Sequence, residues 1–106
     1  MAGWVYAGML DELWEGEILA VTVDAVDLVL CNIEGGVVAY DDRCPHLANP
    51  LSKGSLDGHV LTCAAHEWVF DARTGLGVNP ATACLRPFPV RIDGDTILVN
   101  LDGSDA

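Results

Sequence analysis

Basic residues are scarce in this sequence. Its 106 residues include 5 Lys and Arg against 16 Asp and Glu, which gives a formal net charge of −11 at pH 7. Nucleic acids are bound largely through basic side chains that neutralise phosphates, so this composition excludes DNA or RNA binding by a basic surface. An anionic membrane surface would repel the chain for the same reason. The partner that this charge favours is a basic patch on another protein.

Long hydrophobic runs are also missing. No stretch approaches the ~18 apolar residues that a membrane-spanning helix needs. The first residues lack a basic start, and Asp11 and Glu12 interrupt the apolar stretch that follows, so no targeting segment is predicted. We therefore expect a cytoplasmic protein. In that compartment the cysteines are more often reduced, buried or bound to metal than paired in disulfides.

The length and the 51% hydrophobic content predict one domain over residues 1–106 with a core of its own. Short β-rich runs alternate with Gly, Asp and Asn turns, which predicts a small all-β sandwich or barrel. The expected strands span residues 4–7, 18–23, 28–33, 37–41, 60–62, 68–71, 90–92 and 96–101. One helical turn is expected near 11–14, with Asp11 as its N-cap and Gly16 as its end.

Residues 42–89 differ in composition from the rest of the chain. They contain all 5 Pro, all 3 His and three of the 4 Cys. We expect a loop-dominated insertion there, carried by the sheets, and functional residues are often found on such loops. Outside this region, Cys31 is expected to be a buried small hydrophobe, and Trp4 and Trp14 are expected in the core.

The most informative pattern is Cys44-Pro45-His46, followed after sixteen residues by Cys63-Ala64-Ala65-His66. Each half supplies one thiolate and one imidazole from a short segment. Two Cys and two His suit either a structural zinc ion or a [2Fe–2S] centre with mixed ligands. Common zinc fingers place a helix behind their histidines, whereas the residues after His66 alternate like a strand. The surroundings therefore favour the iron–sulfur centre.

Four segments extend this pattern, and with them nearly the whole chain resembles the Rieske ferredoxins. The segments are 42–46, 51–54, 61–66 and 70–75. The resemblance implies a small antiparallel β-sandwich with a loop-rich cluster-binding subdomain at about 42–86. It further implies one Rieske [2Fe–2S] cluster per chain, with Cys44 and Cys63 on one iron and His46 and His66 on the other.

The function that the resemblance implies is that of a one-electron carrier rather than an enzyme. The stretches 66–70 and 77–80 look most like the ferredoxins of toluene-type aromatic and alkene monooxygenases. Such a ferredoxin is a monomer that passes electrons from an NADH-dependent flavin and iron–sulfur reductase to a di-iron hydroxylase. The alternatives are the ferredoxin of an aromatic-ring-hydroxylating dioxygenase, a nitrite reductase small subunit, and a zinc-stabilised interaction module.

The positions after the second half-site predict a low reduction potential. Respiratory Rieske proteins have Ser and Tyr where this chain has Trp68 and Phe70, and the hydroxyl groups of that pair donate hydrogen bonds to the cluster sulfurs. Fewer donors give less stabilisation of the reduced cluster. We therefore expect a potential toward the bottom of the Rieske range, which is ~−150 to +300 mV.

Overall fold

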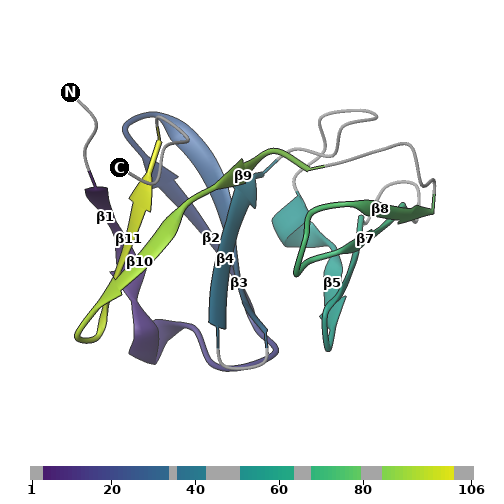
Figure 1. Cartoon of the computed structure of the whole chain (residues 1–106), viewed down its shortest axis with the longest axis horizontal. Helices are drawn as coiled ribbons and strands as arrows, with labels where there is room; N and C mark the ends of the chain where they lie inside the picture. The colour runs from purple at the N-terminus through teal and green to yellow at the C-terminus, as the bar shows by residue number, and fades with distance from the viewer. Residues whose placement is uncertain (1–3, 34–35, 43–50, 64–67, 80–84, 102–106) are drawn as a thin grey trace.

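The computed structural model describes residues 4–33, 36–42, 51–63, 68–79 and 85–101. These residues form short strands in three antiparallel sheets, with two 3-10 turns (Figure 1). The expected all-β class and antiparallel pairing are confirmed. Within the described residues, no helix is both long enough and apolar enough to cross a membrane.

Two of the sheets form the larger part of the molecule, which we call the framework. One sheet has the strand order β1 (Trp4–Met9), β11 (Thr96–Asn100) and β10 (Val90–Asp93). The other has the order β2 (Ile18–Val23), β3 (Val26–Ile33), β4 (Gly36–Asp41) and β9 (Pro87–Phe88). In Figure 1 the first of these sheets lies at the left and the second at the centre. Their shared core includes Leu28, Leu30, Ile97 and Val99, all fully buried.

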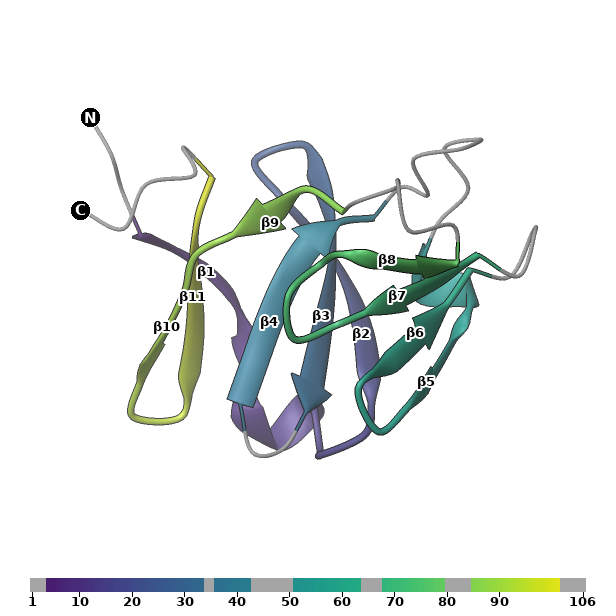
Figure 2. The same ribbon diagram turned by 45° about the vertical axis from the view of Figure 1, so that its right-hand side comes forward.

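The third sheet, which we call the small sheet, lies on the other side of β3 and β4 (Figures 1 and 2). It follows the 3-10 turn η2 (Leu51–Lys53) and has the order β5 (Ser55–Asp57), β6 (Val60–Thr62), β7 (Val69–Asp71) and β8 (Gly77–Asn79). A second core, which includes Leu61 and Phe70, joins this sheet to the framework.

Strand β3 separates the two cores. Its successive side chains point to opposite faces, so Leu28 and Leu30 pack in the framework core while Val29 and Cys31 pack against the small sheet. All four side chains are fully buried. A strand buried on both faces is expected to be hydrophobic without interruption, which explains the run from 28 to 31. The expectation that Cys31 is buried is confirmed.

Several local predictions need correction. The helical turn is the 3-10 turn η1 (Leu10–Glu12), and Glu12 rather than Asp11 closes its start, because Glu12 Oε1 accepts the Met9 N–H at 3.1 Å. Trp14 is 71% exposed instead of buried. Its indole N–H donates to the carbonyl oxygen of Asp11 at 3.0 Å, which holds the ring on the surface. Trp4 is partly buried, and the Arg91 guanidinium stacks over its ring at 4.6 Å.

The region 42–89 was expected to be dominated by loops, yet its described part contains the whole small sheet. Strands β5, β8 and β9 were not predicted at all. Their sequences, Ser-Leu-Asp, Gly-Val-Asn and Pro-Phe, each contain turn-forming residues, which are typical of the breaks between strands.

Candidate metal centre

At one end of the small sheet, an end of each of its four strands lies in the same row. The pairing register aligns Ser55 with Thr62, Thr62 with Val69, and Val69 with Asn79. This row contains the first residues of β5 and β7 and the last residues of β6 and β8 (Figure 2). Cys63 and Trp68, which follow β6 and precede β7, therefore lie beside this row.

Cys63 is the predicted ligand that the structure describes. It follows β6 directly and is fully buried, and its thiol is in no disulfide. Its backbone N–H donates to the carbonyl oxygen of Trp68 at 2.8 Å, which brings together the two ends of the segment that carries the second half-site. Trp68 packs against the core that contains Cys63.

The other three predicted ligands, Cys44, His46 and His66, lie outside the described residues. Within the described residues, no group of three or more Cys, His, Asp or Glu side chains is arranged to hold a metal ion. The structure does place the residues that flank the first half-site, since Asp42 ends one described stretch and Leu51 begins the next.

A close backbone contact joins the residue that follows η2, after the first half-site, to the strand that leads into the second half-site. A Cβ atom at Gly54 would lie 1.9 Å from the carbonyl oxygen of Thr62. Only glycine allows the backbone to approach so closely. Since Gly54 follows η2 and Thr62 precedes Cys63, this contact sets the end of the first segment directly against the start of the second.

The donor set fits a Rieske centre. The chain offers one thiolate and one imidazole in each of two segments, and the described bases of these segments are in contact. A buried, unpaired thiol at the end of β6 is the kind of ligand that such a centre requires. A Cys₂His₂ zinc ion would use the same donors, so the distinction rests on the neighbouring sequence and on the relatives below.

The turn after β7 attaches the small sheet to the framework. The Tyr40 hydroxyl donates to the buried carbonyl oxygen of Ala72 at 2.6 Å. Burial raises the pKa of Tyr40 to about 12, and the nearby Cys31 and Asp71 add to this shift. Gly75, with a φ of +79°, packs so closely that a Cβ there would lie 2.9 Å from the Tyr40 ring.

An ion pair organises the same turn. The Arg73 guanidinium donates to both carboxylate oxygens of Asp71, at 3.0 and 2.8 Å. This hydrogen bonding lowers the pKa of Asp71 to about 2. The Arg73 backbone N–H also donates to Asp71 Oδ1 at 2.9 Å, so the aspartate fixes the first residues of the turn.

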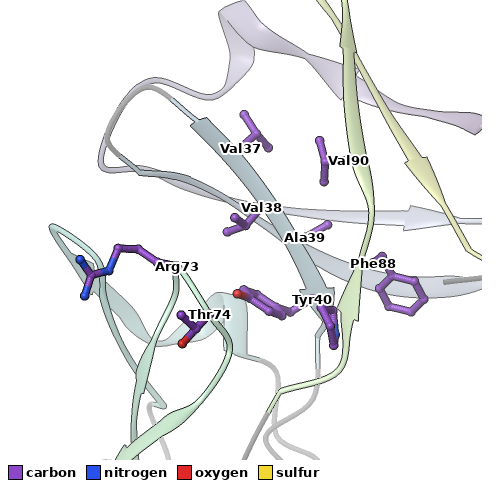
Figure 3. Close-up of a pocket in the computed structure, with 9 residues that line it drawn as sticks. Val37, Val38, Ala39, Tyr40, Arg73, Thr74, Phe88 and Val90 are labelled. Atoms are coloured by element: carbon purple, nitrogen blue, oxygen red, sulfur yellow. The ribbon is translucent and has the colours of Figure 1, made fainter. Parts of the chain in front are cut away.

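A pocket of about 230 Å³ lies along this attachment (Figure 3). Val38 and Tyr40 of β4 line it together with Arg73 and Thr74 of the turn, and Phe88 lies on the β9 side. Of the described residues that line it, none is Cys or His. The pocket is therefore part of the junction between the framework and the small sheet.

Two contacts at the site escaped sequence analysis. One is the Tyr40–Ala72 hydrogen bond, and the other joins the Asp42 carboxylate to Ser52. Both link residues that are 10 or more positions apart, and no local pattern identifies such pairs. Asp42 and Ser52 did lie inside the segments that resembled a known family, but nothing in the sequence indicated that they meet.

Comparison with known proteins gives one family and a consistent set of relatives. The model of the Rieske [2Fe–2S] domain matches residues 3–89. The ferredoxin component of the alkene monooxygenase system of Xanthobacter autotrophicus (strain ATCC BAA-1158 / Py2) is 41% identical over 95 residues, covering 88% of this chain and 77% of that protein. The ferredoxin component of the naphthalene 1,2-dioxygenase system of Pseudomonas aeruginosa is 36% identical over 99 residues, covering 92% of this chain and 95% of that protein.

Solved structures agree with this assignment. A chain in the complex of reduced oxygenase and oxidized ferredoxin in carbazole 1,9a-dioxygenase superposes with a TM-score of 0.83. The sequence identity is 29%, and the superposition covers 92% of each chain.

Proposed function

The chain belongs to the Rieske [2Fe–2S] family, and we propose that it works as the ferredoxin component of a multicomponent oxygenase. In this role it carries one electron at a time and performs no catalysis of its own. The observation that carries the proposal is the buried Cys63 at the end of β6, set beside the base of the first half-site by the contact between Gly54 and Thr62. The named relatives are ferredoxin components of oxygenase systems.

The proposed ligands are Cys44 and Cys63 on one iron and His46 and His66 on the other. A cluster bound in this way accepts and releases a single electron, and replacing two thiolates by neutral imidazoles makes it less negative and easier to reduce than a cluster with four Cys. The chain's own residues hold the half-sites together. Cys63 is held by its backbone bond to Trp68, and the cluster-binding subdomain is proposed to span about 42–86.

The proposed partners are an NADH-dependent flavin and iron–sulfur reductase and the di-iron hydroxylase of an alkene or aromatic monooxygenase. The monooxygenase assignment is supported by the 41% identity to the alkene monooxygenase ferredoxin. The net charge of −11 suits brief docking to basic faces on both partners. We propose that the protein does this in the cytoplasm and as a monomer. Because such attraction is screened by salt, electron delivery is expected to slow as ionic strength rises.

A second candidate is the ferredoxin of an aromatic-ring-hydroxylating dioxygenase. It is favoured by the 36% identity to the naphthalene 1,2-dioxygenase ferredoxin and by the fold match to the carbazole 1,9a-dioxygenase complex. A nitrite reductase small subunit is less well supported, since a solved example is 20% identical and shares the fold alone.

The first test is an EPR spectrum of the purified protein before and after reduction with dithionite. We expect no signal from the oxidised protein and a signal with a low average g value after reduction. The matched variants are Cys63→Ser, which should lose the cluster, and Cys31→Ala, which removes a buried thiol from the same core and should keep it. A colourless protein that contains zinc and gives no signal would overturn the proposal.

The second test separates the two kinds of partner. The reduced protein is mixed with a purified alkene monooxygenase hydroxylase or with a purified naphthalene dioxygenase oxygenase, and its reoxidation is followed by absorbance. Faster electron transfer to the hydroxylase supports the first candidate. Faster transfer to the dioxygenase component supports the second.

A further inference from the structure

A buried carboxylate lies at the point where the chain enters the first half-site. Asp42 follows β4 and is 8% exposed. Its Oδ1 accepts the backbone N–H of Ser52 at 2.8 Å, and its Oδ2 accepts the Ser52 hydroxyl at 2.7 Å. Both carboxylate oxygens of Asp42 therefore accept hydrogen bonds from a single residue, Ser52, which lies beyond the first half-site in the sequence. We call this pair of contacts the carboxylate clamp.

Both sides of the carboxylate clamp are themselves fixed. On the framework side, the Asp42 N–H donates to the carbonyl oxygen of Asp27 at 3.0 Å. On the other side, the Gly54 N–H donates to the carbonyl oxygen of Leu51 at 2.9 Å and closes the turn that contains Ser52. The clamp therefore joins the end of β4 in the framework to the turn that precedes the small sheet.

The Asp42 charge acts on the buried core that contains Cys31. Within the described part of the chain, no Lys, Arg or His side chain pairs with it. Burial raises the pKa of the Cys31 thiol to about 12, and the negative charge of Asp42 adds to that rise. Cys31 shares its core with Cys63. Asp42 also precedes Cys44 by two residues, so their Cα atoms are separated by at most about 7.6 Å.

We propose that Asp42 and Ser52 are positioning residues for the first half-site, and that the Asp42 charge lowers the reduction potential of the cluster. A negative charge fixed in a low-dielectric interior opposes the addition of an electron nearby. Hydrogen bonds to an ionised group are stronger than neutral ones, so the clamp also holds the two ends of the segment in register. The inference rests on the proposed function, since it concerns the same cluster.

The Asp42→Asn variant separates charge from position. An amide oxygen still accepts the Ser52 N–H, and the amide nitrogen donates to the Ser52 hydroxyl oxygen, so both contacts survive without the charge. We expect iron content and EPR line shape to match the wild type. At a fixed applied potential the ratio of reduced to oxidised cluster should rise about tenfold, which corresponds to about 59 mV for one electron.

The matched control for charge is Asp57→Asn, which removes an exposed carboxylate from β5. Solvent screening should make its effect much smaller than that of Asp42→Asn. Equal shifts for the two variants, or no shift for Asp42→Asn, would overturn the assigned role of the Asp42 charge.

Replacements of Ser52 test the positioning role with the charge retained. Ser52→Ala removes the hydroxyl donor, and we expect iron release to a chelator to become about fivefold faster, with a broadened EPR signal. Ser52→Thr keeps the hydroxyl and should restore both properties. Ser55→Ala, at an exposed serine on β5, is the control. If Ser52→Ala behaves like Ser55→Ala, the clamp does not position the half-site.

The wild-type EPR spectrum distinguishes failure of the proposed function from failure of the role proposed for Asp42 and Ser52. A wild-type protein without a mixed-ligand signal contradicts the proposed function itself. A normal wild-type signal together with unchanged Asp42 and Ser52 variants contradicts this inference alone.

Discussion

The framework and the small sheet are held together in different ways. Strands β2, β3 and β4 of the framework have 6, 8 and 6 residues, and they pair continuously over a fully buried core. Each strand of the small sheet has 3 residues. That sheet shares a buried core with one face of β3 and β4, and individual contacts add to it, namely the Tyr40–Ala72 hydrogen bond to the framework and the approach of Gly54 to Thr62 beside the sheet itself. The framework therefore relies on long, continuous strand pairing, whereas the small sheet has short strands and depends more on its shared core and on a few specific contacts.

The largest difference between the two regions should appear at glycines. In Gly54→Ala the new Cβ would lie 1.9 Å from the Thr62 carbonyl oxygen, so the backbone must move, at an expected cost of about 3 kcal/mol. In Gly8→Ala of β1 the nearest atom is a Leu19 methyl at 3.6 Å, which is ordinary contact, and little change is expected. Thermal unfolding and iron content of the two loaded variants measure the contrast. Equal losses of stability and iron in the two variants would show that the backbone at Gly54 accommodates an added methyl group as easily as the backbone at Gly8.

Alkaline pH should weaken the junction between the two regions. The pKa values of Cys31 and Tyr40 rise from 9.0 and 10.0 to about 12 on folding. The folded state therefore holds these protons more tightly than the unfolded state, and stability is full below about pH 9 and falls as pH rises toward 12. For Tyr40 the loss approaches about 2 kcal/mol at pH 12. Unfolding midpoints measured between about pH 9 and pH 12 give the slope of stability against pH, and Tyr40→Phe should make this slope shallower. A slope that Tyr40→Phe leaves unchanged would contradict the assignment.

At neutral pH, Tyr40→Phe tests the same junction through one hydrogen bond. The change leaves the Ala72 carbonyl oxygen buried without its donor, at an expected cost of about 1–2 kcal/mol. Tyr6→Phe is the matched control, because Tyr6 lies on β1 and is 58% exposed. Chemical unfolding of both variants gives the two free energies. A loss for Tyr6→Phe as large as that for Tyr40→Phe would mean that the buried bond is not what matters.

Sequence analysis succeeded where a β-rich run is bounded by clear turn residues. Strand β2 was predicted with its observed bounds, since 18–23 is a β-rich run that ends at a turn. The two half-sites follow from ligands that lie close together in the sequence, and they stay a prediction, because Cys63 alone of the four proposed ligands lies within the described residues, where it is buried. Strands β5 and β8 were missed because Ser-Leu-Asp and Gly-Val-Asn each contain turn-forming residues. The exposed position of Trp14 depends on a hydrogen bond from its indole N–H to the Asp11 carbonyl oxygen, which residue propensity does not reveal.

The smallest expected effect is a gain, and it lies in the framework. Asp24 and Ala25 form the turn between β2 and β3 with φ values of 50° and 67°. Aspartate tolerates this left-handed region, whereas alanine is strained there. Glycine is preferred at the second position of such a turn, so Ala25→Gly should stabilise the protein by about 0.5–1 kcal/mol. If stability rises while iron content and reduction potential remain those of the wild type, the framework can be strengthened independently of the centre. A changed reduction potential would show instead that the turn and the centre are coupled. The connecting path would be β3, which follows this turn and whose Asp27 carbonyl oxygen accepts the Asp42 N–H.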